Sequence, residues 1–226
     1  MWIGTTNSGK LGEFAALLAP LGIPLDILSL DVPETGSTFE ENAKIKALAY
    51  AKAAMSCGRD RGSVVICEDS GLVVPALNGL PGPWSARFAD LDLETKTVQD
   101  SKPLSGDLFL LVGGRHETDR RNNERLLEMM SGIAMPFRGA YFAIHITVAK
   151  EGKVLCEVKG EAHGWIATEP KGTKGFGYDP IFIGQDTFGK TYAELDPVRK
   201  NLRSHRKKAM DQLYMWLSQH FAEVLT

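Results

Sequence analysis

The chain has 226 residues, enough for one large domain or two small ones. Its 26 Lys and Arg residues nearly balance its 28 Asp and Glu residues, and the net charge of −2 argues against a protein that coats nucleic acid or an anionic membrane. With 43% hydrophobic and 24% charged residues, the composition is that of an ordinary globular protein rather than a disordered chain.

Cysteine usage and hydropathy indicate the compartment. The three cysteines, Cys57, Cys67 and Cys156, form no C-x-x-C pattern, which favours reduced thiols over a disulfide framework or a zinc site. No apolar run approaches about 20 residues, and the first residues lack the basic and apolar regions of a signal peptide. We therefore expect a cytoplasmic protein without a transmembrane segment.

The first third of the chain predicts alternating strands and helices. After a short strand at the very start, apolar residues recur at helical spacing from 11 to 18. Residues 38–55 form the clearest helix, because they open on the capping-box pattern T-F-E-E and continue as an alanine-rich run. The β-branched run 63–67 predicts a buried strand that ends at the polar residues 68–71.

The rest of the chain predicts further elements around one irregular segment. Residues 90–121, polar and highly charged around a short apolar island, predict an insertion or lid. The other predicted elements are a helix at 122–130, a hairpin of strands at 141–149 and 154–158, a glycine-rich loop at 172–177 and a C-terminal helix at 207–225. This mixture favours an α/β fold with a mixed sheet, in a single domain over residues 1–226.

The turn T-T-N-S-G-K at residues 5–10 is the first segment that suggests chemistry. A strand leading into such a turn and then a helix points backbone N–H groups at one spot, and Lys10 adds a full positive charge. This is typical of a phosphate or carboxylate cradle. It is not a Walker P-loop, because the upstream glycine is missing and Leu11 replaces the magnesium-binding hydroxyl residue. An ordinary helix cap with a surface lysine is the alternative.

Acidic residues at two places could bind a metal or activate water. Glu68 and Asp69 stand together at the predicted end of a buried strand, where open α/β sheets bind ligands. A carboxylate there can hold Mg²⁺ or act as a base, and a plain strand-to-turn transition is the alternative. Glu41 is foremost a capping carboxylate, although one of its oxygens could cap the helix while the other binds a metal.

Two later segments suit a nucleotide. In the loop 172–180 three glycines surround Phe176, whose ring could stack on a base. Asp179 could bind the ligand or an arginine. The alternative is a glycine-rich turn with the ring packed into the core. Six of the ten residues at 199–208 are Lys or Arg, which suits a polyanion of limited size such as a triphosphate. The alternatives are a solvated helix start and a nucleic-acid patch, for which interleaved aromatic residues are lacking.

The order of these motifs is more specific than any one of them. The chain contains, in sequence, T-T-N-S-G-K, T-F-E-E-N-A-x-x-K-A, E-D-S-G-L-V-V-x-A-L-x-G-x-P-G-x-x-S-A-R-F, N-N-x-x-L-L, P-x-G-x-x-G-F-G-Y-D-P-x-F, T-Y-A-E-L and K-N-x-x-S-H-R-x-x-A. From Thr5 to about Leu213 the chain closely resembles the inosine triphosphatase family, the non-canonical purine nucleoside triphosphate pyrophosphatases.

The resemblance implies an elongated, two-lobed α/β fold with a long mixed central sheet flanked by helices, a cleft between the lobes and, usually, a homodimer. It implies hydrolysis of inosine, deoxyinosine and xanthosine triphosphates (ITP, dITP and XTP) to the monophosphate and pyrophosphate, with Mg²⁺ as cofactor. No nucleic-acid or membrane partner is expected, given the near-zero net charge.

Carried over position by position, the resemblance implies that Glu41 and Asp69 hold the metal and that Asp69 is the base that activates water. The other implied site residues would bind substrate: Thr5, Thr6, Asn7, Ser8, Gly9 and Lys10 the phosphates, Ser70 the nucleotide, Phe176, Gly177, Tyr178 and Asp179 the purine, and Lys200, His205 and Arg206 the base and the phosphate side.

Three features depart from the family pattern. Glu68 stands where the family usually has an aspartate, residues 90–121 are longer by about 20 than expected, and the first strand is so short that the true start could lie upstream. Two alternatives therefore stay open. One is a pyrophosphatase for another nucleotide, and the other is a non-catalytic nucleotide-binding module.

Overall fold

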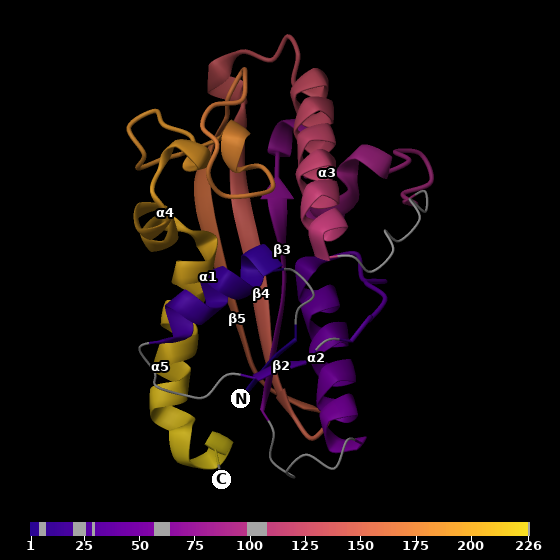
Figure 1. Cartoon of the computed structure of the whole chain (residues 1–226), viewed down its shortest axis with the longest axis vertical. Helices are drawn as coiled ribbons and strands as arrows, with labels where there is room; N and C mark the ends of the chain where they lie inside the picture. Colours follow the sequence, from indigo (N-terminus) through magenta and orange to yellow (C-terminus); the bar gives the residue numbers. More distant parts are fainter. Residues whose placement is uncertain (5–7, 20–25, 29, 57–63, 99–107, 226) are drawn as a thin grey trace. The chain divides into compact units, whose positions relative to one another are not determined.

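The computed structural model describes residues 1–4, 8–19, 26–28, 30–56, 64–98 and 108–225 (Figure 1). Within these ranges six strands form one sheet in the order β2-β1-β3-β4-β5-β6. The strands are β1 (Trp2–Gly4), β2 (Asp26–Leu28), β3 (Val65–Val73), β4 (Gly139–Lys150), β5 (Lys153–Ile166) and β6 (Phe182–Gly184). The α-helices are α1 (Ser8–Leu18), α2 (Phe39–Ser56), α3 (Leu108–Met129), α4 (Pro197–Arg203) and α5 (His205–Leu225).

The sheet is mixed, as predicted. β1 pairs in parallel with β2 and with β3, whereas β5 pairs antiparallel with β6. β4 and β5 are neighbours and form the predicted hairpin. Its turn residues, Glu151 and Gly152, have positive φ angles of 51° and 75°, which match the twist of paired strands. The α/β class is thereby confirmed.

The chain divides into two compact units. Unit 1 comprises Met1–Ser70, Ala143–Glu161 and Asn201–Thr226, and unit 2 comprises Gly71–Phe142 and Ala162–Lys200. Strands β3, β4 and β5 contribute residues to both units. Each unit has its own hydrophobic core.

The core of unit 1 has two parts, one on each face of β3. Successive strand residues point to opposite faces, and Ile66 accordingly packs with α1 and α5, whereas Val65 and Cys67 pack with α2. Packing on the α2 face is tight, since a Cβ on Gly4 would lie 2.5 Å from Cys67 Sγ. Burial raises the pKa of the Cys67 thiol to about 12, so it acts as a packing group rather than a nucleophile.

Unit 2 is built around aromatic rings and one buried cation. The rings of Phe142, Phe182 and Tyr192 pack against one another with centroid distances of 4.6, 4.9 and 6.1 Å. Arg138 is only 3% exposed. Its guanidinium donates to four carbonyl oxygens, those of Met130, Ile133, Ile166 and Ala167. These bonds join the residues after α3 to the end of β5.

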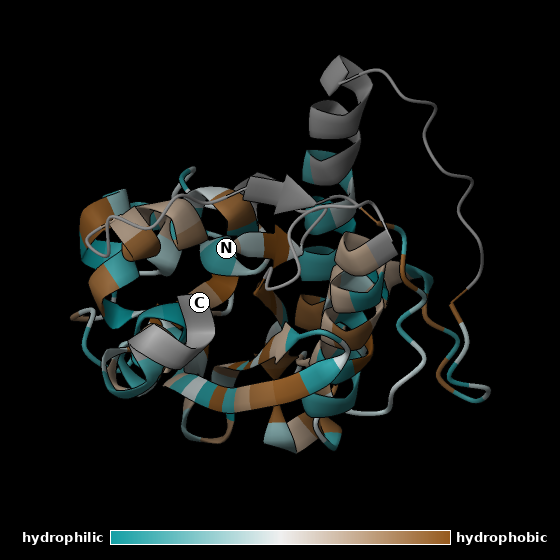
Figure 2. Ribbon diagram, turned by 90° about the horizontal axis from the view of Figure 1, so that it is seen from below, coloured by the Kyte–Doolittle hydropathy of each residue, from teal (hydrophilic) through white to brown (hydrophobic). Residues whose placement is uncertain are grey.

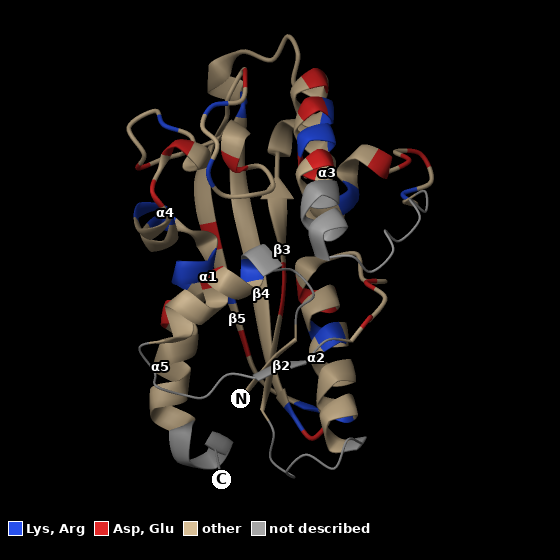
Figure 3. Cartoon of the chain, viewed as in Figure 1, with Lys and Arg blue, Asp and Glu red and all other residues tan. Residues whose placement is uncertain are grey.

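Helix α3 begins earlier than the sequence predicted, at Leu108 instead of residue 122. The glycine pair and the dense charge of this stretch suggested irregular structure. In the structure the charges pair along the helix, where the Arg120 guanidinium lies 2.6 Å from Glu117 and 2.5 Å from Glu124, and Figure 3 shows both signs following one another along α3. Residues 99–107 lie outside the described ranges, and the lid stays a prediction.

Helix α5 turns one side to the core of unit 1 and carries charged residues on another. Figure 2 shows hydrophilic and hydrophobic residues interspersed along the helices. In α5, Met210 and Leu213 enter the core of unit 1, while Lys207 pairs with Asp211. None of the helices within the described ranges is both long and apolar enough to cross a membrane.

Candidate active site

Strand β3 runs past the end of its neighbour β1. The pairing of these strands ends where Gly4 lies opposite Cys67, and β3 continues to Val73. Glu68 and Asp69 are therefore inside a strand, and the prediction that the strand ends before them was wrong. Asp, Ser and Gly favour turns, but here both carboxylates are only 4% exposed and are paired with polar side chains from helices. They still lie just past the carboxyl end of β1, the parallel neighbour of β3, and this end of the strands is where α/β sheets bind ligands.

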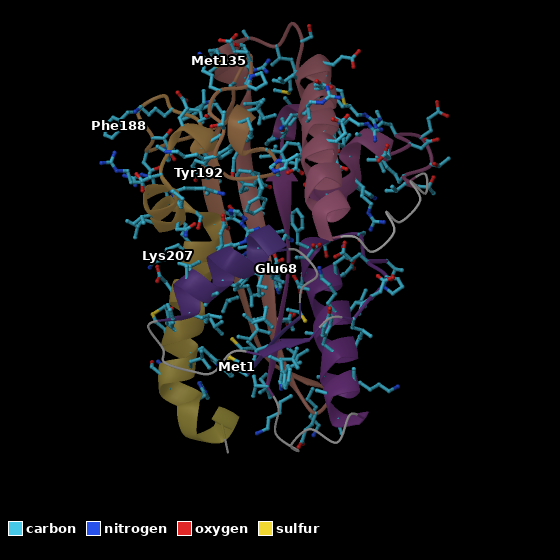
Figure 4. The ribbon with its side chains drawn as sticks, in the orientation of Figure 1. Met1, Glu68, Met135, Phe188, Tyr192 and Lys207 are labelled. Atoms are coloured by element: carbon cyan, nitrogen blue, oxygen red, sulfur yellow. The ribbon has the colours of Figure 1, made fainter. Side chains whose placement is uncertain are left out.

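Alternation along β3 separates the polar residues of its motif into two groups. Glu68, labelled in Figure 4, and Ser70 face α1 and α5, as their contacts with residues of these helices show. Asp69 faces α2, where its hydrogen-bond partner lies. The two adjacent carboxylates thus have different bonding partners within unit 1, although the charges of Lys10 and Lys46 act on both of them.

The system on the α1–α5 face consists of two ion pairs and a hydroxyl. Lys10 Nζ lies 2.7 Å from Glu68 Oε1, and Arg206 Nη1 lies 2.6 Å from Glu13 Oε2. Arg206 Nη2 also donates to Ser70 Oγ at 3.2 Å. Arg206 is 4% exposed, so its charge is compensated by protein groups rather than by solvent.

Glu68 is ionised at neutral pH despite its burial. Burial acts to raise its pKa, but the charges of Lys10, Arg206 and Lys46 outweigh it and lower the pKa to about 2. Its second oxygen, Oε2, is buried and accepts no hydrogen bond from the described residues. Such an oxygen can still accept a bond from a ligand or a cation.

The system on the α2 face surrounds Asp69. Asn42 Nδ2 donates to Asp69 Oδ2 at 3.1 Å, and Lys46 Nζ lies 3.4 Å from Asp69 Oδ1 and 2.6 Å from Glu34 Oε1. Burial raises the pKa of Asp69 to about 6, although the neighbouring lysines act in the opposite direction. Burial would lower the pKa of Lys46, but the nearby carboxylates raise it above its usual value.

Sequence reasoning missed Asn42 and Lys46 as site residues. The signal was present, because both belong to the motif E-N-A-x-x-K-A and are four residues apart on one helix. That spacing places them on the same face of α2, and in the structure this face meets Asp69. Glu13, the partner of Arg206, lies three residues after Lys10 on α1 and was missed in the same way.

Glu41 caps α2, as predicted, but with a different second bond. Its backbone N–H donates to Thr38 Oγ1 at 3.1 Å. Its carboxylate oxygen Oε2 accepts bonds from Ser37 N at 2.6 Å and Ser37 Oγ at 2.8 Å. These bonds lower the pKa of Glu41. Neither of them uses Oε1, so the cap is compatible with a metal at the other oxygen.

The donor chemistry of unit 1 fits a hard divalent cation. Carboxylate oxygens are the ligands that Mg²⁺ prefers, and Asp69 and Glu41 carry them, while Oε2 of Glu68 is a further unsatisfied oxygen on the opposite face of β3. No three His, Cys, Asp or Glu side chains converge on one point in the part of the chain that the structure describes. A metal here would therefore complete its shell with substrate phosphates and water, as Mg²⁺ commonly does.

Unit 2 contains the predicted aromatic plate. Asp179 Oδ2 accepts the Phe176 N–H at 2.9 Å and lies 2.5 Å from Lys200 Nζ, which in turn lies 4.6 Å from the centre of the Phe176 ring. A Cβ on Gly175 would lie 2.0 Å from Asp179 Oδ2, so this approach requires glycine. The structure thus brings together Phe176, Asp179 and Lys200.

Tyr178 belongs to the core of unit 2. It is 4% exposed, its hydroxyl donates to Ser85 O at 2.9 Å, and burial raises its pKa well above the usual value. A contact of this residue with a ligand would therefore use its backbone.

The basic run predicted at 199–208 is divided between the units. Lys200 is in unit 2, whereas Ser204, His205 and Arg206 are in unit 1 and are all less than 5% exposed. For these three residues a solvated helix start is therefore excluded. Of the predicted phosphate cradle, residues 5–7 (Thr5, Thr6 and Asn7) lie outside the described residues. Ser8, Gly9 and Lys10, which were predicted in the turn before the helix, instead form its first residues, because α1 begins at Ser8.

Comparison with known proteins gives consistent matches over nearly the whole chain. The model of the Ham1 family matches residues 1–216. A dITP/XTP pyrophosphatase of Geobacillus kaustophilus is 40% identical over 216 residues, which cover 93% of this chain and 90% of that protein. One of Bacillus licheniformis is 37% identical over 224 residues, covering 96% and 97%. The structure of a HAM1 protein from Coxiella burnetii superimposes with a TM-score of 0.72 at 32% identity, over 96% of this chain and 98% of that one.

Proposed function

The chain belongs to the Ham1 family, and on this premise we propose that it hydrolyses dITP, XTP and ITP to the corresponding monophosphate and pyrophosphate. The observation that carries the proposal is the buried carboxylate of Asp69, whose pKa of about 6 leaves it ionised at neutral pH and still basic. A general base works best when its pKa lies near the working pH.

In this proposal Asp69 takes a proton from the attacking water. Asn42 holds Oδ2 by a hydrogen bond of 3.1 Å, which fixes the plane of the carboxylate. Lys46 keeps the carboxylate ionised by its charge at 3.4 Å. The other oxygen, Oδ1, has the longer contact and is the better placed to accept a proton.

The phosphates would be bound on the α1–α5 face of β3. Lys10 stands in the first turn of α1, where the helix N-terminus adds partial positive charge, and residues 5–9 would contribute backbone N–H groups. Arg206 adds a second cation, and Ser70 a hydroxyl. Because Glu68 and Glu13 pair with the two cations, an incoming polyphosphate must compete with these carboxylates.

Glu41 and Asp69 would hold Mg²⁺, which when bound neutralises charge on the phosphates and on the leaving pyrophosphate. Glu68 supplies a negative charge next to this position. Its side chain is one methylene longer than the family's usual aspartate, and its Oε2 has spare acceptor capacity.

The purine would stack on Phe176, whose ring is fixed by Lys200 and Asp179. Specificity would come from donors at the purine 6-oxo group, a role for which His205 and Arg206 are suited. Adenine presents a 6-amino donor instead, and two buried donors that face each other are costly. We further propose that the protein is a homodimer. We also propose that it lies in the cytoplasm, in keeping with the free thiols of Cys67 and Cys156.

A panel of nucleoside triphosphates with Mg²⁺ tests this function. Chromatography should show that dITP, XTP and ITP give the monophosphate and pyrophosphate, whereas ATP and GTP react poorly. Release of orthophosphate, or equal rates on ATP, would contradict the proposal. Binding of ITP without product on long incubation would indicate a non-catalytic binding module.

Replacing Lys46 by methionine should weaken the base at neutral pH. Without the adjacent charge, the pKa of Asp69 is expected to rise by about one unit or more, so kcat/KM at pH 7 falls by up to about tenfold and recovers toward pH 9. The pH profile of kcat/KM measures this shift. Lys52→Met, an exposed change on the same helix, is the matched control. A loss that is equal at all pH values would argue against this role.

A further inference from the structure

One motif of the sequence has no role in the proposed site, the N-N-x-x-L-L run on α3. In the structure Asn123 Nδ2 donates to Gly177 O at 3.0 Å, and Asp119 Oδ2 accepts the Gly177 N–H at 2.7 Å. Asp119 and Asn123 are four residues apart and so share one face of the helix. One helix face therefore binds both backbone polar groups of a single glycine.

This glycine directly follows the aromatic plate. The Phe176 N–H donates to Asp179, and the next N–H, that of Gly177, donates to Asp119. Two consecutive amides are thus held by carboxylates from different elements. Gly177 has a φ of 62°, a left-handed conformation that a glycine adopts without strain but that other packing must hold in place. Both bonds hold the backbone from which the Phe176 ring projects.

Helix α3 is itself firmly anchored in unit 2. Asn122 Oδ1 accepts the Ala89 N–H at 2.7 Å, and Arg125 Nη1 donates to Phe88 O at 2.6 Å. Leu126 is fully buried in the core. The side chains that reach Gly177 therefore project from a fixed support, which is what a positioning residue needs.

We propose that Asp119 and Asn123 are positioning residues for purine recognition, which act by holding Gly177 and thereby the Phe176 ring. This inference rests on the proposed function, because it assigns the ring to the base of the substrate. It predicts that the two residues affect binding of the base and not of the phosphates. A purely structural role would affect both.

The experiment compares Asp119→Ala, Asp119→Asn and Asn123→Ala with wild type. Loss of a charge-assisted hydrogen bond should raise the KM for dITP by about tenfold in Asp119→Ala, with kcat within about twofold of wild type. The inhibition constant of inorganic tripolyphosphate, which has no base, should stay unchanged. Asp119→Asn should restore most of the affinity, since its carboxamide oxygen can accept the same bond. Glu117→Ala, whose carboxylate binds Arg120 on the exposed side of α3, is the matched control.

A second comparison tests whether the effect passes through the ring. In a Phe176→Leu background, Asp119→Ala should cause no further rise in KM, because coupled residues are not additive. An equal rise in that background, or an equal weakening of tripolyphosphate inhibition, would overturn the proposal.

Hydrogen–deuterium exchange separates this inference from the proposed function. The peptide that contains residues 176–178 should lose protection in Asp119→Ala and keep it in Glu117→Ala, whether or not the protein hydrolyses dITP. Unchanged protection in Asp119→Ala would refute the positioning role. Failure of wild type to hydrolyse dITP would instead refute the proposed function.

Discussion

Replacing Asp69 with asparagine is expected to lower kcat for dITP hydrolysis by about 10²- to 10⁴-fold, the usual contribution of a general base. Asparagine has the same shape and can still accept the bond from Asn42, but it cannot take a proton from water. Single-turnover and steady-state rates with Mg²⁺ measure the loss. Glu40→Gln, an exposed change in the first turn of α2, serves as the control. A variant with more than about a tenth of wild-type kcat would remove Asp69 from the role of base.

The same variant should be more stable than wild type at neutral pH. The pKa of Asp69 rises from 3.8 to about 6 on folding, so the folded state favours the protonated form. The protonated side chain contributes its full stabilisation below pH 3.8, and this contribution is lost as the pH rises through 6. At pH 7 the loss amounts to about 3 kcal/mol of the free energy of unfolding. The neutral side chain of Asp69→Asn does not ionise, so the variant does not lose this contribution. Urea denaturation at pH 7 should show the gain, and a loss of stability there would contradict the raised pKa.

Replacing Glu68 with glutamine should have the opposite effect on stability. The pKa of Glu68 falls from 4.5 to about 2 on folding, so the ionised side chain stabilises the folded state. This contribution is complete above pH 4.5, amounts to about 3 kcal/mol, and is lost as the pH falls through 2. Glu68→Gln should therefore be less stable than wild type at pH 7 and approach it in acid.

Urea denaturation of both proteins at several pH values between 2 and 7 measures the difference. Glu40→Gln again provides the control, because it makes the same chemical change at an exposed position. If the difference between Glu68→Gln and wild type stays constant from pH 7 to pH 2, then lost packing rather than lost charge explains the effect. The two adjacent residues of β3 thus have stability effects of opposite sign.

The elements with a strong local signal were predictable. The helix of residues 38–55 has an N-terminal cap and a uniform composition, and the structure confirms it as Phe39–Ser56. The hairpin was predictable because its turn supplies two residues with positive φ. In both cases residues close in sequence determine the conformation.

The errors arose where distant residues decide the conformation. Glu68 and Asp69 remain in a strand because Lys10 and Asn42, far away in the sequence, compensate their burial. The charged stretch of α3 from residue 117 onward is helical because its side chains pair with one another and with η3 (Gly82–Asp90).

The candidate site was predictable where single residues carry a motif, and not where partners complete it. Asp69 and Phe176 stood out by type and context. Asn42, Glu13 and Asp119 have ordinary side chains in ordinary helices, and only tertiary structure shows what they bind. Helical spacing from Lys10 could have identified Glu13, and the motif that Asn42 shares with Glu41 could have identified Asn42.

The alternation along β3 makes the site depend on strand register. A slip of one residue would keep every charge in place along the chain but exchange the faces, so that Glu68 would meet α2 and Asp69 would meet Lys10. Close packing at two glycines, one in β1 and one in β3, opposes this slip. A Cβ on Gly4 would collide with Cys67, and one on Gly71 would lie 2.2 Å from Ser85 Oγ. A residue with a side chain therefore does not fit at either position. A mutation at these glycines would therefore misplace the chemistry without removing any chemical group.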